Sequence, residues 1–146
     1  MGADTSATHM IFFITAVMIA LSVTGALFLN IQSLTSALTT SSKTLASQLK
    51  TDIKIINDPE IIPNSVGNYT FYVKNIGNED LYTGQINVII DGSIVTNFNT
   101  DIIEGDTMWI SGDVLRINAI VSLPSGSHNI RVITDNGIED SFNFRI

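Results

Sequence analysis

The sequence of 146 residues contains no cysteine, which excludes disulfides, thiolate zinc sites and cysteine nucleophiles. Basic side chains are also scarce, because 7 Lys and Arg stand against 14 Asp and Glu, for a net charge of −7. A surface that binds nucleic acid needs clustered Lys and Arg, so we expect no nucleic-acid partner. The length is that of about one domain.

Charged side chains are missing from one continuous segment, because none occurs between Asp4 and Lys43. Residues 10–29 are its most apolar part, and 11 of these 20 are Ile, Leu, Val or Phe. As a helix they would span roughly 30 Å, the thickness of the hydrocarbon core of a bilayer. The 11 apolar side chains favour insertion by roughly 3–7 kcal/mol. This pattern predicts a helix that crosses a membrane in contact with lipid.

A cleaved signal sequence is the alternative interpretation of this segment. Such a signal normally begins with basic residues, whereas residues 1–9 carry only Asp4 and His9 as ionisable side chains. A prepilin-type signal would also place Lys or Arg ahead of its cleavage point, so we expect the segment to be retained. Lys43 is the nearest basic residue and lies on the presumed outer side, where it weakly favours the opposite orientation.

Beyond the apolar run, the pattern predicts that the helix continues, from about residue 8 to about residue 50. Leucine and isoleucine recur there at spacings of 3, 4, 7 and 4 residues, a narrow helical stripe that suits helix self-association. We call these residues the stalk stripe: Ile31, Leu34, Leu38, Leu45 and Leu49. A flexible Ser/Thr-rich stalk is the alternative. Within the membrane run, small residues that would allow close helix packing recur every four positions: Ala16, Ala20 and Thr24.

After residue 50 the apolar period changes from helical to alternating, which predicts β-strands. The expected strands are 52–57, 69–75, 85–91, 94–99, 107–110, 114–122, 128–134 and 138–145. Asp91-Gly92 and Asn136-Gly137 are typical of two-residue hairpins. Residues 57–68, with two prolines, predict a long loop that crosses between sheets, and Trp109 is expected in the core. The predicted fold is a long N-terminal α-helix in residues 1–50, followed by an all-β immunoglobulin-like sandwich in residues 51–146.

Motifs of catalysis are missing, including Gly-x-Ser-x-Gly, His-Glu-x-x-His and a phosphate-binding Gly-Lys-Ser/Thr loop. We therefore expect no enzyme, no nucleotide, no cofactor and no metal. Ser125, Ser127 and His128 adjoin one another in a predicted turn, where serine serves turn formation. Three carboxylates around one hairpin, Asp135, Glu139 and Asp140, could form a calcium site, but a solvated hairpin is the better interpretation.

One N-glycosylation sequon, Asn68-Tyr69-Thr70, lies at the edge of a predicted loop. Asn68 is a candidate for modification if the β domain lies outside the cell.

The order of motifs behind the apolar helix resembles the G-type accessory proteins of the archaeal flagellum, or archaellum, which are related to the F-type proteins. Three stretches carry this resemblance: 51–59 (TDIKIINDP), 69–77 (YTFYVKNIG) and 88–92 (VIIDG). The likeness is strongest over residues 10–92. It implies a non-enzymatic, membrane-anchored stator that links the motor to the S-layer. It also implies an extracytoplasmic β domain, an F-type partner, and assembly through the N-terminal helix.

Two alternatives remain. A pilin- or archaellin-like filament subunit shares the helix-and-sandwich plan. A membrane-anchored surface binding module would need exposed aromatic side chains on one face, for which Tyr69, Tyr72 and Tyr82 are the candidates.

Overall fold

The structure is a computed structural model, and it describes residues 2–105 and 107–146. The chain divides into two compact units, Met1–Lys43 and Thr44–Ile146. The last turns of the N-terminal helix, from Thr44 onward, therefore belong to the same unit as the β domain. Met1, the first residue of the predicted helical segment, lies outside the described residues.

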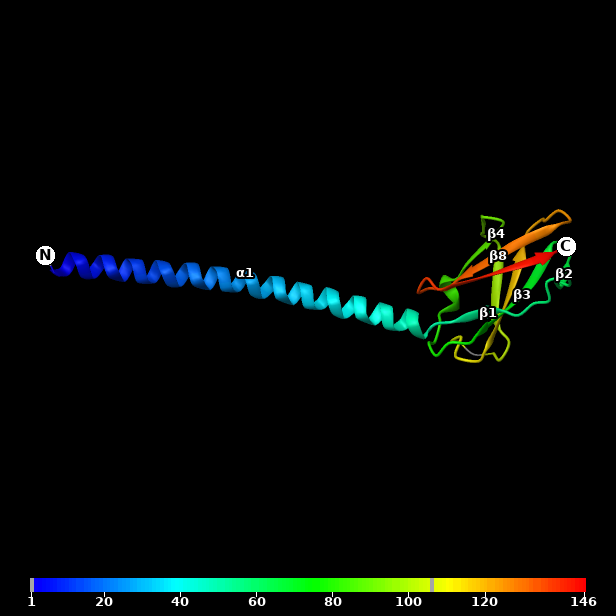
Figure 1. Ribbon diagram of the computed structural model, residues 1–146, viewed down its shortest axis with the longest axis horizontal. Helices are drawn as coiled ribbons and strands as arrows, with labels where there is room; N and C mark the ends of the chain where they lie inside the picture. The colour runs from blue at the N-terminus through cyan, green and yellow to red at the C-terminus, as the bar shows by residue number, and fades with distance from the viewer. Residues whose placement is uncertain (1, 106) are drawn as a thin grey trace. The chain divides into compact units, whose positions relative to one another are not determined.

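The N-terminal helix α1 runs without a break from Gly2 to Lys50 (Figure 1). It contains no proline, and Gly25 is the one glycine after its first residue. Its hydroxyl groups bond back to the helix itself: Thr15, Ser22 and Thr24 each donate to the carbonyl oxygen four residues earlier, at 2.8 Å. These side chains therefore need no other partner in an apolar solvent. The predicted end of the helix is confirmed, whereas the helix begins at Gly2 and not at about residue 8.

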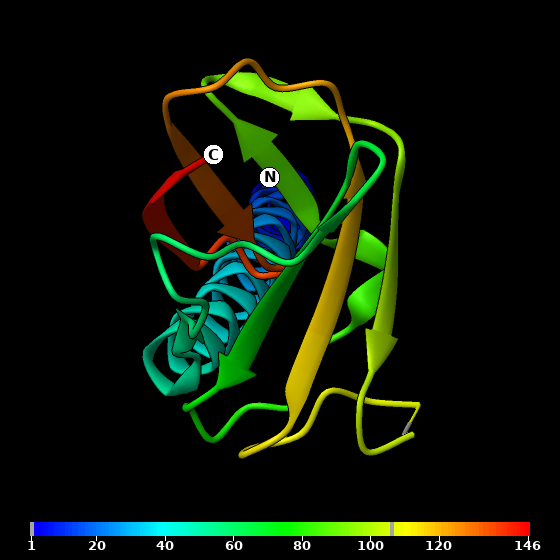
Figure 2. The ribbon, with the colours of Figure 1, turned by 90° about the vertical axis from the view of Figure 1, so that its right-hand side faces the viewer.

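The β domain consists of two antiparallel sheets, which confirms the predicted class (Figure 2). One sheet has the strand order β1-β3-β7-β6, with β2 also paired to β3; the other has the order β5-β4-β8-β9. The strands of the first sheet are β1 (Ile53–Ile55), β2 (Asn64–Ser65), β3 (Asn68–Asn75), β6 (Phe98–Ile102) and β7 (Val114–Ile120). Those of the second are β4 (Asn87–Ile90), β5 (Ser93–Val95), β8 (Ser127–Ile133) and β9 (Glu139–Arg145). A 3₁₀ turn, η1 (Thr83–Gln85), precedes β4.

The core lies between the two sheets, and alternation along the strands fills it. β3 and β7 bury every second side chain, as the sequence pattern predicts. Trp109 is fully buried, as expected, and its ring N–H donates to the carbonyl oxygen of Asp113 at 3.0 Å. Phe71 of one sheet meets Phe144 of the other edge-to-face, with ring centroids 5.2 Å apart.

Four details of the strand and loop prediction are wrong. The single strand expected at 94–99 is two strands, because the chain leaves the second sheet after Val95 and joins the first at Phe98. The strand expected at 107–110 is an isolated bridge between Leu81 and Trp109. The loop at 57–68 does not cross between sheets, because the strands before and after it, β1 and β3, pair with each other. It also contains the short strand β2, which the prediction missed.

The hairpin prediction is right at one position and too short at the other. Asp91 and Gly92 have φ of 50° and 78° and join β4 to β5 in a two-residue turn. Between β8 and β9, by contrast, Thr134 closes on Ile138 through an N–H···O bond of 2.8 Å, so the loop has three residues between them.

Candidate functional site

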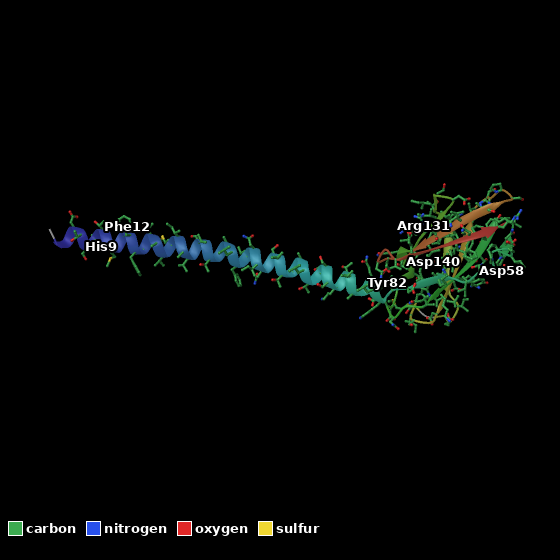
Figure 3. All side chains as sticks on the ribbon, viewed as in Figure 1. His9, Phe12, Asp58, Tyr82, Arg131 and Asp140 are labelled. Atoms are coloured by element: carbon green, nitrogen blue, oxygen red, sulfur yellow. The ribbon has the colours of Figure 1, made fainter. Side chains whose placement is uncertain are left out.

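The apolar side chains of α1 are exposed along its whole membrane-length run. Phe12 is 72% exposed and Leu21 68% exposed, and Figure 3 shows Phe12 standing out from the helix. Among the described residues, α1 is the one helix long and apolar enough to cross a membrane, and no part of its most apolar window is buried. A signal sequence near the N-terminus meets the same criteria of length and composition.

The five members of the stalk stripe are exposed as well, at 57–79% of their surface. A row of exposed Leu and Ile at helical spacing is a candidate surface for helix pairing. The small residues of the membrane run lie on the surface of α1 too. The Thr24 hydroxyl donates to the carbonyl oxygen of Ala20, so between these two residues the helix offers methyl groups rather than a free hydroxyl.

The C-terminal end of α1 is hydrogen-bonded to the loop after β3. We call this contact, which lies within the unit Thr44–Ile146, the junction. The carbonyl oxygen of Lys50 accepts the N–H of Asn78 at 2.7 Å. The N–H groups of Ile76 and Gly77 both donate to the carbonyl oxygen of Asp52, at 2.9 Å. A Cβ atom on Gly77 would lie 2.4 Å from the oxygen of Lys50, so only glycine allows the chain to approach this closely.

Asn136, in the β8–β9 hairpin of the second sheet, also forms hydrogen bonds to the end of α1 at the junction. Its side-chain N–H groups reach Thr51 Oγ1 at 2.6 Å and Ser47 Oγ at 3.3 Å. Its backbone carbonyl oxygen accepts Gln48 Nε2–H at 2.8 Å. Its amide oxygen accepts the hydroxyl of Thr134 at 2.7 Å, which fixes the orientation of the side chain.

A fully buried amide, Asn75, sets the shape of the loop that receives the helix. Its Nδ2–H groups donate to the carbonyl oxygens of Glu79 and Trp109, and its Oδ1 accepts the N–H of Gly77. These bonds satisfy the side chain, which would otherwise destabilise the core. Sequence reasoning missed the roles of Asn75, Gly77 and Asn136, because Asn-x-Gly and Asn-Gly indicate turns and do not identify what a turn contacts.

His128 is a buried ionisable side chain of the β domain, and it pairs with Asp91 rather than with a serine. Its Nδ1 lies 2.6 Å from Asp91 Oδ2, and its Nε2 lies 2.8 Å from the carbonyl oxygen of Pro124. Both partner atoms are hydrogen-bond acceptors, so this geometry favours the doubly protonated, cationic ring. The hydrogen bond to Asp91, then that to Pro124, raises the pKa of His128. Both ring nitrogens thus contact Asp91 and Pro124 rather than Ser125 or Ser127.

The pKa of Asp91 is lowered from its ordinary value, mainly by the backbone N–H of Asn129 and then by the bond to His128. The pair thus joins the β4–β5 turn to the start of β8 and to the loop before it. Both charges are used in holding these segments together.

Two of the three carboxylates considered for calcium, Asp140 and Glu139, have protein partners. Asp140 forms an ion pair with Lys54 at 3.0 Å and accepts the N–H of Ile55 at 2.9 Å, and Glu139 lies 3.8 Å from Arg131. Figure 3 labels Asp140 and Arg131 on the second sheet. Across residues 2–105 and 107–146, no three His, Asp or Glu side chains are grouped so that they could hold a metal ion.

The candidate aromatic face of a binding module is not assembled. Tyr69 is 5% exposed, Tyr72 is half-buried and Tyr82 is exposed. Asn68, the sequon residue, begins β3 beside the β2–β3 turn and is half-buried, with Oδ1 turned inward.

Comparison with known proteins identifies the family. The sequence model of the archaeal-type flagellins matches residues 3–144. The chain belongs to the archaeal-type flagellin family. Within this family it is similar to flagella-related protein G of Methanocaldococcus jannaschii, with 32% identity over 142 residues that cover 93% of this chain and 92% of that protein.

Two solved structures share the fold. The archaellum periplasmic stator protein FlaG from Sulfolobus acidocaldarius matches 64% of this chain and 99% of its own, with a TM-score of 0.50 and 19% identity. A chain of the archaeal flagellum of Methanospirillum hungatei matches 98% of this chain and 92% of its own, with a TM-score of 0.60 and 12% identity.

This archaeal-type flagellin is therefore a component of the archaellum, related to the G-type proteins, and the resemblance drawn from the sequence is confirmed. The family consists of structural components of the archaellum. Its immunoglobulin-like β domain and its apolar N-terminal helix agree with that assignment.

Proposed function

We propose that this protein is a non-enzymatic stator component of the archaellum motor, anchored in the cytoplasmic membrane by α1 and projecting its sandwich outward. The observation that carries the proposal is the exposure of the apolar side chains of α1, such as Phe12 at 72%. Something outside the chain has to cover them, because this much exposed apolar surface is unfavourable in water. Over residues 10–29 that cover is lipid.

Above the membrane, the stalk stripe assembles copies of the chain through their helices. Exposed Leu38 and Leu45 on one face supply the apolar seam that helix pairing needs. The alternative of a flexible stalk is less favoured, because the helix continues through residues 39–42 without interruption.

The junction suits a static part that has to resist force. Lys50, Thr51 and Asp52 are bonded to two loops of the β domain, one from each sheet. A load on the sandwich is thus passed to the end of α1 through several hydrogen bonds rather than through a flexible linker. The F-type partner and the S-layer attachment remain predictions that rest on the resemblance of the sequence to G-type proteins.

The orientation can be tested directly because the chain has no cysteine of its own. Single cysteines at the exposed positions Ser6 and Ser125 would report on the two sides of the membrane. A membrane-impermeant maleimide should label Ser125→Cys on intact cells and Ser6→Cys only after lysis. Labelling of Ser6→Cys alone on intact cells would overturn the proposed orientation, and lysed cells provide the control in which both must react.

A filament subunit is the second candidate, and one observation favours it. The likeness to the chain of the archaeal flagellum extends over 98% of this chain, helix and sandwich included. That likeness concerns the fold. A filament subunit would be abundant in the filament itself, whereas a stator stays with the motor in the membrane.

A further inference from the structure

The end of α1 carries an apolar surface that its own β domain leaves uncovered. Leu45 and Leu49 are 57% and 79% exposed, although the same turns of the helix are bonded to the domain through Ser47 and Gln48. Successive helix residues are about 100° apart. The two leucines therefore lie on nearly the opposite side of the helix from Ser47.

The β domain exposes an apolar side chain of its own, Ile76, in the loop that bonds to the end of α1. This side chain is 51% exposed and directly precedes Gly77, the residue that meets Lys50 and Thr51 at the junction. Leu49 directly precedes Lys50 in α1. Lys50 and Gly77, which contact each other, are therefore each preceded in the sequence by an exposed apolar residue. We call Leu45, Leu49 and Ile76 the collar.

Charges of both signs lie beside the collar and are not used within the chain. Lys50 is exposed, and its carbonyl oxygen accepts the N–H of Asn78, the residue before Glu79 and Asp80. Yet within the part of the chain that the structure describes, the side chains of Lys50, Glu79 and Asp80 form no ion pair. The ammonium group of Lys50 and the carboxylates of Glu79 and Asp80 can therefore pair with opposite charges on a partner that carries the same three residues.

We propose that the collar is a contact surface for a second copy of this chain, with Lys50 of one copy paired to Glu79 and Asp80 of its neighbour. The inference rests on the proposed assembly through the stalk stripe, and it adds the β domain to that interface. Leu45 and Leu49 belong to both surfaces, so pairing of the stripes brings the neighbour's junction to this one. The net charge of −7 makes copies repel one another overall. The attraction between Lys50 of one copy and Glu79 and Asp80 of the other offsets that repulsion where the copies meet.

The test measures how the oligomer of the full-length chain in detergent depends on concentration, by sedimentation velocity. Lys50→Glu should raise the concentration for half-assembly roughly fivefold, the effect of an exposed ion pair worth about 1 kcal/mol. Adding Glu79→Lys and Asp80→Lys to that variant should restore assembly to near the unsubstituted level. Arg145→Glu is the matched control, because it makes the same change of charge at the far end of β9.

The outcomes separate this inference from the proposed function. The variant Leu38→Lys plus Leu45→Lys removes the stripe itself. If it dissociates the oligomer while Lys50→Glu has no effect, the collar is not a contact and the stalk assembly stands. If Arg145→Glu weakens assembly as much as Lys50→Glu, or if the triple variant stays dissociated, the specific pairing is wrong. If neither the stripe variant nor Lys50→Glu changes assembly, both proposals fail.

Discussion

The side-chain amide of Asn136 donates to Thr51 Oγ1 at 2.6 Å, joining residues that are 85 positions apart in the sequence. Thr51 directly follows the last residue of α1, and Asn136 lies at the tip of the β8–β9 hairpin. This contact ties the end of the helix to the second sheet, while Gly77 ties it to the first. The junction is thus held from both layers of the sandwich.

Replacing Asn136 by alanine should loosen the last turn of α1. The substitution removes the bonds to Thr51 and Ser47 and one of the two acceptors that the hydroxyl of Thr134 contacts. We expect a loss of about 1–3 kcal/mol in the free energy of unfolding, measured by urea denaturation. Hydrogen exchange should show faster exchange at the Thr51 amide. Asn143→Ala, which removes an exposed amide pair with Asn129, is the control and should change stability little.

Gly77→Ala should be among the more harmful glycine substitutions in the chain. Its Cβ atom would lie 2.4 Å from Lys50 O and 2.5 Å from Asp52 N, both backbone atoms that cannot rotate away. Steric crowding of this kind costs roughly 1–3 kcal/mol. Gly84→Ala has no heavy atom within 4 Å of its new methyl group and should stay within about 0.5 kcal/mol of the parent. Equal melting temperatures for the two variants would contradict the description of the junction.

The bond between His128 and Asp91 predicts a pH-dependent stability. Because the pKa of His128 is raised in the folded protein above its ordinary 6.5, the contribution is fully present below pH 6.5. It is lost as the pH rises through the folded-state pKa. The melting temperature should therefore fall on the alkaline side, and His128→Gln should flatten that decline.

Asp91 acts in the opposite pH range. Its pKa is lowered below the ordinary 3.8, so its contribution is present above that pH and is lost only as the pH falls through the lowered value.

A melting curve of His128→Gln that still falls on the alkaline side would show that another group controls that range.

Leu38→Lys together with Leu45→Lys should abolish oligomers in detergent without unfolding the β domain. Both side chains are exposed, so lysine disturbs no core packing, but it places charges in the proposed seam. Sedimentation velocity reports the assembly, and near-UV circular dichroism of the buried Trp109 reports the fold. Oligomers of unchanged size would contradict self-association through the stalk stripe.

Much of the fold could be predicted because its signals are local. The absence of charge between Asp4 and Lys43 indicates α1, and alternation in β3 and β7 indicates their buried faces. The split of the strand at 94–99 could not be predicted, because no proline or glycine between Val95 and Phe98 marks the point where the chain changes sheets. The segment around Trp109 has apolar residues like those of a strand, but its pairing is limited to the isolated bridge between Trp109 and Leu81.

The sequence predicts only the part of the candidate site whose signal is local. The stalk stripe is a pattern along one helix and can be read from its spacing. The junction depends on contacts between distant segments, such as Gly77 with Lys50 and Asn136 with Thr51, and neither asparagine nor glycine signals its partner. Likewise, no local pattern links His128 to Asp91, which is 37 positions away in the sequence and belongs to a turn.

The most direct test of the stator assignment is to locate the protein by quantitative mass spectrometry. Surface filaments are sheared from cells and compared with the remaining membrane fraction, and the mass of the N-terminal peptide is determined in each. The account predicts that the protein stays in the membrane fraction with motor proteins and keeps residues 2–9. Its enrichment in the sheared filament, with a trimmed N-terminus, would contradict the account and identify a filament subunit.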